Sequence, residues 1–329
     1  MKRVLVTGAT GFLGKYVIDE LKNDYELIAF GRNKTKGSAL ECKNVKFISG
    51  DFTDYDEINK AMKGVDMVVH AGALSTVWGK WEDFYKMNVL GTDNVMKAVL
   101  NNKVKKIVFI SSPSIYTDKM DRFNIKEHEV DEKNELNFYI KSKIMGEKIV
   151  NDGRKHGINT VIIRPRGLLG IGDPSMLPRI IKANKKIGIP LMNDGKNLVD
   201  ITCVENVAFA IRLCLETDKA NGNVYNITNG EPREFKQILE ELFSEMKVKP
   251  KYKKIKFETL FNVANGIEKI CLMLRIYKEP PLTRYTVATL GHSQTLNIDK
   301  AKKDLGYETK ITLSEGIKNY AREINQSNY

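Results

Sequence analysis

The sequence predicts a doubly wound α/β domain, built around a parallel sheet, with a smaller mixed α/β lobe attached to it. Two observations support this fold class. Short apolar runs alternate with helical patterns through the first half of the chain, and the centres of those runs are continuously apolar. Strands of this kind, when joined by helices, form parallel sheets that are covered on both faces. We therefore expect a central sheet with helices packed on each side.

The expected strands are short apolar runs, separated by turns or helical patterns. They lie at Arg3–Thr7, Glu26–Phe30, Val45–Ser49, Met67–His70, Lys106–Ile110 and Thr160–Ile163. Helices are expected at Phe12–Asn23, Asp54–Met62 and Glu82–Asn102, and another begins near Phe138.

The alternation of strands and helices breaks after Arg164-Pro165, where glycines and prolines cluster. A helix at Val204–Leu215 and a strand at Val224–Ile227 then indicate a return to the sheet. Mixed helices and a charged tail follow. We expect two parts, a sheet domain of residues 1–165 and 199–228 and a smaller lobe of residues 166–198 and 229–329.

The composition excludes several classes of protein. The chain has 329 residues, 42% of them hydrophobic, so it can bury a sizeable core and is not expected to be disordered. No apolar run approaches the roughly 18 residues that span a bilayer, and the first apolar run reaches a glycine too early for a signal peptide. The four cysteines and four histidines are scattered, so neither a disulfide framework nor a metal site is expected. We expect a reduced, cytoplasmic protein.

The net charge of +12 is unevenly distributed along the chain. Lys247–Lys278 holds nine basic and two acidic residues, together with apolar residues at helical spacing. Ordinary packing with a lysine-rich outer face is the favoured interpretation. A lid over an acidic acyl substrate and a peripheral contact with an anionic membrane are the alternatives. Nothing resembles the interleaved aromatic and basic residues of an RNA platform, so no nucleic-acid partner is expected.

A glycine-rich turn follows the first strand and opens the first helix, in the segment Thr7–Gly14. Gly8 permits the turn, Gly11 lets backbone amides approach a phosphate, and Gly14 lets the helix and the strand pack closely. A pyrophosphate at the start of a helix needs this arrangement, so we predict a dinucleotide site rather than a purely structural turn. The predicted contacts in this turn are Gly8, Thr10, Gly11, Phe12, Leu13 and Gly14.

The end of the second strand favours NADP over NAD as the cofactor. An NAD site usually places an acidic side chain there, whereas this chain has Gly31 followed by Arg32. An arginine fork suits a 2′-phosphate, although a solvated basic loop is the alternative.

Two further loops are expected to contact the cofactor. After the third strand, Asp51 is placed to meet the adenine, with Phe52 beside it. The turn of Ala71, Gly72 and Ala73 after the fourth strand can pass beneath the cofactor phosphates.

Tyr139 and Lys143 are four residues apart at the start of a helix and so share one face. A phenol with a pKa near 10 is a poor acid or base unless a nearby cation favours its ionised form. Lys143 can supply that charge while it bonds the nicotinamide ribose. Ser112, at the end of the preceding strand, is placed to hold the substrate oxygen that Tyr139 protonates, and Ser114 is a weaker candidate. A surface tyrosine stacked on a lysine stem is the alternative.

Taken together, these motifs resemble the extended short-chain dehydrogenases/reductases of the NAD-dependent epimerase/dehydratase superfamily, whose larger domain has the Rossmann fold. The resemblance rests on the glycine turn, the Ser111-Ser112 doublet, Tyr139-x-x-x-Lys143 and Asn88 in Asn88–Thr92. Arg164-Pro165 and Asp200–Ala208 extend it over essentially the whole chain.

The resemblance implies roles for particular residues. Ser112, Tyr139 and Lys143 would be the catalytic triad. Asn88 would order a helix and a water in the proton relay, unless it is a structural asparagine. Pro165 would lie near the nicotinamide amide.

Three segments make the chain look most like the branch that holds 3β-hydroxysteroid dehydrogenases and 2-alkyl-3-oxoalkanoate reductases. They are Val77–Lys80, Ser112–Thr117 and Glu279–Tyr285. The branch implies an NAD(P)H-dependent oxidoreductase that interconverts a ketone and a secondary alcohol on a small apolar, β-keto acyl or steroid-like substrate. A nucleotide-sugar epimerase or dehydratase with tightly bound NAD is the alternative.

Two further expectations concern contacts with a partner subunit and with the substrate. In this superfamily the helix at Glu82–Asn102 and the helix after Tyr139 commonly form a homodimer interface, with core packing as the alternative. Arg166 has two interpretations, as a partner of a substrate carboxylate or as part of a structural ion pair.

Overall fold

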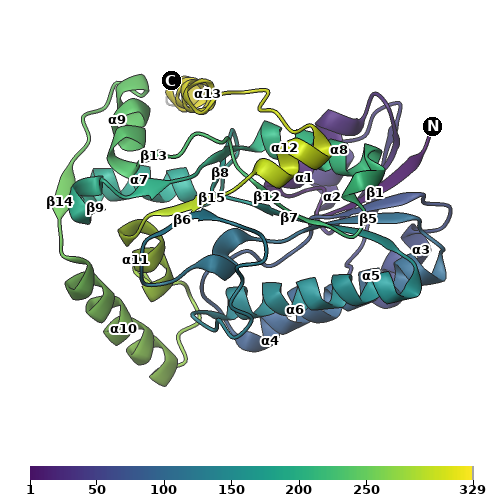
Figure 1. The fold of residues 1–329 in the computed structure, drawn as a ribbon, viewed down its shortest axis with the longest axis horizontal. Helices are drawn as coiled ribbons and strands as arrows, with labels where there is room; N and C mark the ends of the chain where they lie inside the picture. The colour runs from purple at the N-terminus through teal and green to yellow at the C-terminus, as the bar shows by residue number, and fades with distance from the viewer. Residues whose placement is uncertain (328–329) are drawn as a thin grey trace.

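The computed structural model describes residues 1–327 and is organised around a seven-stranded parallel sheet (Figure 1). The strand order is β12-β7-β5-β4-β1-β2-β3, so the chain winds outward from β1 in both directions. The strands are β1 (Arg3–Thr7), β2 (Glu26–Gly31), β3 (Val45–Ser49), β4 (Met67–His70), β5 (Lys106–Ile110), β7 (Asn159–Pro165) and β12 (Val224–Ile227). The predicted doubly wound fold class is confirmed.

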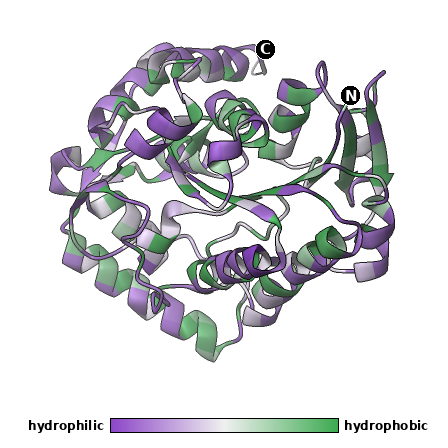
Figure 2. Cartoon of the chain, turned by 45° about the vertical axis from the view of Figure 1, so that its right-hand side comes forward, coloured by the Kyte–Doolittle hydropathy of each residue, from purple (hydrophilic) through white to green (hydrophobic). Residues whose placement is uncertain are grey.

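Helices cover both faces of this sheet (Figure 1). Residues of β1 alternate between the two cores, since Val4 and Val6 pack on one side and Leu5 on the other. Figure 2 shows apolar residues concentrated in these strands. One face carries α1 (Phe12–Leu21), α8 (Val204–Glu216) and α12 (Asp299–Leu305), and the other carries α3 (Tyr55–Ala61), α5 (Gly91–Asn101) and α6 (Phe138–Asp152).

The helix expected at Glu82–Asn102 is interrupted. It begins as α4 (Trp81–Phe84), widens into a π-helical turn at Tyr85–Leu90 and continues as α5. The backbone N–H of Gly91 donates to the carbonyl of Lys86, five residues earlier. The turn thus accommodates one extra residue, and Asn88 lies within it.

A second, smaller group of elements lies at the left of Figure 1. It contains a four-stranded sheet of order β13-β10-β15-β6 and two short strand pairs, β11-β8 and β14-β9. The strands are β6 (Arg122–Ile125), β8 (Leu168–Leu169), β9 (Ile189–Leu191), β10 (Leu198–Val199), β11 (Thr202–Cys203), β13 (Arg233–Glu234), β14 (Tyr252–Lys254) and β15 (Gln294–Leu296). The helices of this group are α7 (Met176–Lys186), α9 (Phe235–Glu245), α10 (Phe257–Met273), α11 (Arg284–Gly291) and α13 (Leu313–Ser327), whereas the short α2 (Lys34–Ser38) packs on β2 and β3 of the large sheet.

Helix α10 lies in the basic segment and packs along only part of its length. Ala264 and Cys271 are buried, and Phe257 packs against the core beneath α11. Its C-terminal end is different, because Met273 and Leu274 are 74% and 59% exposed. In Figure 2 apolar residues continue to this end of the helix. Ordinary packing therefore accounts for the buried face of α10, which holds Ala264 and Cys271, and not for the exposed residues at its end. Among the described helices, α10 included, none has the length and apolar character that crossing a bilayer requires.

Candidate active site

The glycine turn after β1 is packed tightly against the turn after β4. Gly8 has φ +69°, and a Cβ placed there would lie 2.8 Å from the Cα of Gly72. A Cβ on Gly14 would collide with the carbonyl oxygen of Gly8. Only glycine therefore fits at these two positions. Half-buried Ala71 and Ala73 flank Gly72, so the two loops form one backbone floor.

The helix that follows this floor begins without a capping side chain. Gly11 is the N-cap of α1 and offers no side-chain acceptor to the amides of Phe12 and Leu13. Uncapped amides at a helix start attract the negative charge of a phosphate. Thr10 lies beneath Gly31, where a Cβ would be 3.0 Å from its Oγ1. The residues present thus fit a dinucleotide lying across the glycine turn.

At the end of β2, Gly31 occupies the last strand position, and Arg32 follows with its side chain 66% exposed. Its Nη1 lies 3.7 Å from Oδ2 of Asp51. The other carboxylate oxygen of Asp51 accepts the backbone N–H of Thr53 at 2.9 Å. Phe52 is buried, and a Cβ on Gly72 would lie 2.5 Å from its ring, so it supports the loop that carries Asp51.

A buried histidine, His70, connects the backbone floor formed by the two loops to the interrupted helix. Thr92 Oγ1 donates to the carbonyl of Asn88 at 2.7 Å and therefore accepts from Nε2–H of His70 at 3.2 Å. Nδ1 of His70 is then the acceptor for the Thr7 hydroxyl at 2.7 Å, and Thr7 accepts the Gly72 amide at 3.1 Å. Burial lowers the pKa of His70 to about 3, with the Lys143 charge adding to the effect. His70 therefore stays neutral, as a structural bridge.

Ser112 and Tyr139 come together at the carboxyl end of β5. Tyr139 lies in the first turn of α6, which Asn137 caps by accepting the Ile140 amide at 2.8 Å. Burial raises the pKa of Tyr139 to about 12, while a hydrogen bond with Ser112 opposes that rise. The Ser112 hydroxyl donates to Oγ of Ser114 at 2.9 Å. Tyr139 is therefore a protonated donor at neutral pH.

Lys143 is buried, and its ammonium bonds the main chain at the end of β5. Its Nζ donates to the carbonyl of Ile110 at 2.7 Å and lies 4.5 Å from the centre of the Phe109 ring. Burial lowers the pKa of Lys143 to about 8, and the Glu147 carboxylate opposes this. Burial of the phenol is the largest influence on the pKa of Tyr139, and the lowering expected from Lys143 stays a prediction.

The side chain of Asn88 is bonded to α6. Its amide oxygen accepts from the Leu74 N–H at 2.7 Å, and its amide nitrogen donates to the Leu74 carbonyl at 3.0 Å. The same nitrogen donates to Oγ of Ser142 at 2.9 Å, and Ser142 in turn donates to the carbonyl of Tyr139 at 2.8 Å. Asn88 thus holds the loop after β4 against the turn that carries Tyr139.

A comparison with known families agrees with this geometry. The family model described as the NAD dependent epimerase/dehydratase family matches residues 4–228. The chain belongs to this family. It is an NAD(P)-dependent oxidoreductase of the epimerase/dehydratase family, with a NAD(P) cofactor typical of such enzymes.

Similar proteins include a reductase and a dehydrogenase. The 2-alkyl-3-oxoalkanoate reductase of Stenotrophomonas maltophilia (strain K279a) is 30% identical over 324 residues, which cover 96% of this chain and 97% of that one. The decarboxylating sterol-4-alpha-carboxylate 3-dehydrogenase of Mus musculus is 30% identical over 328 residues, covering 96% and 89%.

Among solved structures, UDP-glucuronic acid 4-epimerase from Bacillus cereus in complex with NAD has a TM-score of 0.79. The two chains are 22% identical, and the match covers 98% of this chain and 99% of the epimerase. At this identity the likeness shows a shared fold.

Two features of this family member were not anticipated from the sequence. The hydroxyl of Tyr285, in α11, lies 2.6 Å from Oγ of Ser114, so a residue near the end of the chain reaches the serine loop. In the sequence, Tyr285 is singled out only as the end of the Glu279–Tyr285 segment, and no role is predicted for it. The second feature is a buried ion pair between Arg164 and Glu147, joined by two hydrogen bonds of 2.8 and 2.6 Å. Pro165, beside Arg164, ends β7 and pairs with Ile227.

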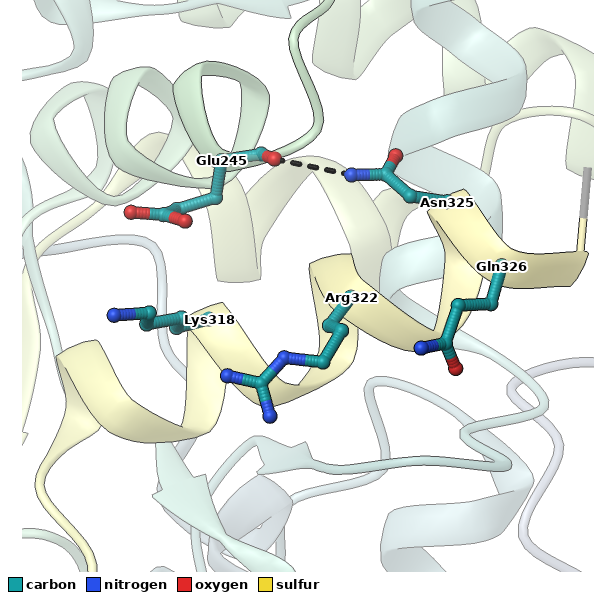
Figure 3. Close-up of a pocket in the computed structure, with 5 residues that line it drawn as sticks. All are labelled: Glu245, Lys318, Arg322, Asn325 and Gln326. Atoms are coloured by element: carbon teal, nitrogen blue, oxygen red, sulfur yellow. Dashed lines mark hydrogen bonds between the residues drawn. The ribbon is translucent and has the colours of Figure 1, made fainter.

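A hollow on the outer surface lies away from all these groups (Figure 3). It lies between α9 and α13, where the Glu245 carbonyl accepts from Nδ2 of Asn325 at 3.2 Å. Its lining is charged and polar, with Lys318 and Arg322 on α13. No predicted catalytic or cofactor residue lines it, so it is not a candidate for the oxidoreductase site.

Proposed function

We propose that this enzyme interconverts a ketone and a secondary alcohol on an apolar 3-oxo acyl or sterol-like substrate. The observation that carries the proposal is the pairing of Ser112 with a protonated Tyr139 at the carboxyl edge of the sheet, the same edge that holds the glycine turn. When bound, the nicotinamide supplies the hydride for reduction or accepts it in oxidation. Ser112 and Tyr139 would hydrogen-bond the carbonyl oxygen, and Tyr139 would donate its proton to that oxygen.

Lys143, in α6, and Asn88, in the π-helical turn that packs against α6, would support this chemistry. The Lys143 ammonium is buried beside the end of β5, where it would bond the ribose next to the nicotinamide. Asn88 would keep Tyr139 in place through Ser142. Pro165, at the end of β7, would lie near the nicotinamide amide.

The test is a panel of substrates followed at the nicotinamide absorbance. Purified protein is assayed with β-keto acids, steroid ketones and short aldehydes, each with NADPH and with NADH. Reduction of the first two classes is the expected result. A protein that retains NAD through purification and converts UDP-sugars, with no turnover of free ketones, would instead be a nucleotide-sugar epimerase or dehydratase.

We further propose that NADP is the preferred cofactor. Gly31 ends β2 without an acidic side chain, which leaves room for a 2′-phosphate. The exposed guanidinium of Arg32, the next residue, supplies a positive charge for that phosphate. Lys34 and Lys36, at the following short helix, would add positive charge.

Arg32→Ala is expected to raise the KM for NADPH about ten- to a hundredfold, because a charge-assisted bond to phosphate is lost. The KM for NADH should remain nearly constant. Steady-state kinetics with both cofactors measures this difference, and Lys43→Ala, which removes another exposed charge, is the control. Equal changes for the two cofactors would contradict the assignment.

We also propose a homodimer formed through α5 and α6. The two helices pack side by side, and apolar Leu90 and Leu100 are partly exposed along this region. Sedimentation equilibrium of the full chain measures the oligomeric state, and a monomer at micromolar concentration contradicts the proposal.

The end of α10 is proposed to contact an anionic lipid surface. Its exposed apolar residues include Met273 and Leu274, and Lys269, Arg275 and Lys278 are close in sequence. Each basic side chain near an anionic surface contributes about 1 kcal/mol to the binding free energy.

The double variant Met273→Glu/Leu274→Glu is expected to lower binding to phosphatidylglycerol-containing vesicles at least about tenfold in flotation assays. Ile187→Glu, at a site that is 76% exposed in the C-cap of α7, is the control and should bind like the unaltered protein. Equal binding by all three proteins would contradict the proposal.

A further inference from the structure

Arg166 is fixed at the carboxyl end of β7, directly after Pro165. Its backbone N–H donates to the Ile227 carbonyl at 3.0 Å, and its own carbonyl accepts the Thr202 hydroxyl. The main chain is therefore anchored on both sides. The carboxyl ends of parallel strands are where folds of this kind bind ligands, and the Arg166 residue is only 6% exposed there.

The guanidinium of Arg166 has no partner within residues 1–327. It donates no hydrogen bond to that part of the chain and forms no ion pair with it. Tyr285 and Asp200 act on its charge through space, while burial lowers its pKa. The Asp200 carboxylate is engaged elsewhere, since it accepts the Leu296 N–H at 2.7 Å. A buried cation without a partner raises the free energy of the folded state. A ligand of opposite charge would supply the missing partner.

Arg164, two residues earlier, shows what a structural arginine looks like in the same place. It is 4% exposed, and Glu147 holds it through two charge-assisted hydrogen bonds. Its third nitrogen donates to Tyr116 and to the Glu127 carbonyl. Arg164 and Arg166 are equally buried, yet only Arg164 has its donors satisfied by the protein.

A series of hydroxyls connects the surroundings of Arg166 to the catalytic tyrosine. Tyr285, whose hydroxyl interacts with the charge of Arg166, lies 2.6 Å from Oγ of Ser114. Ser114 accepts from Ser112 at 2.9 Å, and Ser112 bonds Tyr139. Tyr285 also acts electrostatically on Tyr139 itself. An anion beside Arg166 would therefore be close to the reacting carbonyl.

We propose that Arg166 binds a carboxylate of the substrate, so that this enzyme acts on 3-oxo acids and their 3-hydroxy counterparts rather than on neutral ketones. The inference rests on the proposed ketone–alcohol interconversion. In a 3-oxo acid the carboxylate carbon is two bonds from the ketone carbon, so the anion site has to lie near Ser112. Tyr285, which acts on the charge of Arg166, and Ser114, which bonds both Tyr285 and Ser112, link the two residues. The planar guanidinium can pair with both carboxylate oxygens, and the Tyr285 hydroxyl can donate a further hydrogen bond. The carboxylate is retained unchanged while the ketone gains one hydride and one proton.

The test compares an acid with its own neutral derivative. 3-Hydroxy acids of short, medium and long chain and their methyl esters are oxidised with NADP⁺, because the hydroxy acids do not decarboxylate as 3-oxo acids do. The unaltered enzyme should prefer the acid at least about tenfold in kcat/KM. Arg166→Met should lower kcat/KM for the acid about a hundredfold and leave the ester nearly unchanged, since only the acid loses an ionic partner.

Two measurements separate a ligand-binding role from a structural one. The melting temperature of Arg166→Met should stay the same or rise, because no protein partner is left unpaired. Binding of NADPH, followed by its fluorescence, should also be unchanged. Arg164→Met is the matched control and should lower the melting temperature, since it strands the Glu147 carboxylate. Arg166→Lys should keep part of the preference for the acid.

The possible outcomes are distinct. Equal turnover of acid and ester by the unaltered enzyme overturns the carboxylate site and leaves the proposed function intact. An equal loss on both substrates in Arg166→Met, or a lowered melting temperature, also overturns it by showing a structural role. No turnover of any acid, ester or ketone with either cofactor overturns the proposed function itself.

Discussion

Tyr139→Phe is expected to lower kcat for ketone reduction by about 10²–10⁴-fold, the usual contribution of a positioned proton donor. The substitution removes only the hydroxyl and keeps the ring in the first turn of α6. Because burial raises the pKa of Tyr139 to about 12, the phenol carries its proton throughout the neutral range and is available as an acid. Stopped-flow or steady-state reduction assays measure the loss, and NADPH binding should be retained.

Tyr285→Phe is the matched control for this substitution. It also removes one phenolic hydroxyl close to the serine loop, but that hydroxyl bonds Ser114 and not the proposed proton-transfer site. We expect its effect to fall mainly on KM, with kcat reduced much less than in Tyr139→Phe. Full activity in Tyr139→Phe would exclude this tyrosine as the donor.

Glu147→Leu is expected to lower the free energy of unfolding by about 3–5 kcal/mol, as the loss of one partner from a buried ion pair does. The side chains of Arg164 and Glu147 are 4% and 8% exposed, so the stranded guanidinium cannot recover its hydration. The Ser111 hydroxyl would lose its acceptor at the same time. Urea unfolding at neutral pH, followed by circular dichroism, measures the change.

Two further variants check the cause of this loss. Glu240→Gln removes an exposed i,i+4 partner of Lys236 and should change the free energy of unfolding by less than about 0.5 kcal/mol. The double variant Glu147→Leu/Arg164→Met should recover much of the stability, because neither charge remains buried. A double variant as unstable as Glu147→Leu would show that packing, and not the unpaired charge, is responsible.

The central sheet could be predicted from sequence because its strands are buried apolar runs with clear ends. Arg3–Thr7, Val45–Ser49, Met67–His70 and Lys106–Ile110 have the bounds that the sequence predicted. The smaller sheet could not, since its strands are two to four residues long. Their pairing joins distant segments, as where Val199 pairs with Gln294, and local patterns do not encode such contacts.

The site shows the same division between local and distant information. The glycine turn and the Tyr139–Lys143 spacing are local motifs, and the sequence therefore indicated them. The direction of Lys143, whose ammonium bonds Ile110, depends on how α6 packs on β5. The difference between Arg164 and Arg166 is of the same kind. Glu147 reaches one of them from α6, and no acidic side chain of the described chain pairs with the other.

The π-helical turn at Tyr85–Leu90 has a consequence for insertions and deletions. Each residue of a regular helix advances the helix by about 100°, so the extra residue in this turn sets the rotation of everything after it. Gly91 follows directly and faces the ring of Phe52, where a Cβ would lie 2.5 Å away. Deleting one residue of the turn would restore ordinary helical hydrogen bonding, yet it would rotate Gly91 away from that ring and Thr92 away from His70. The number of residues in this turn therefore sets how α5 is rotated against Phe52 and His70, beside the two loops that form the backbone floor.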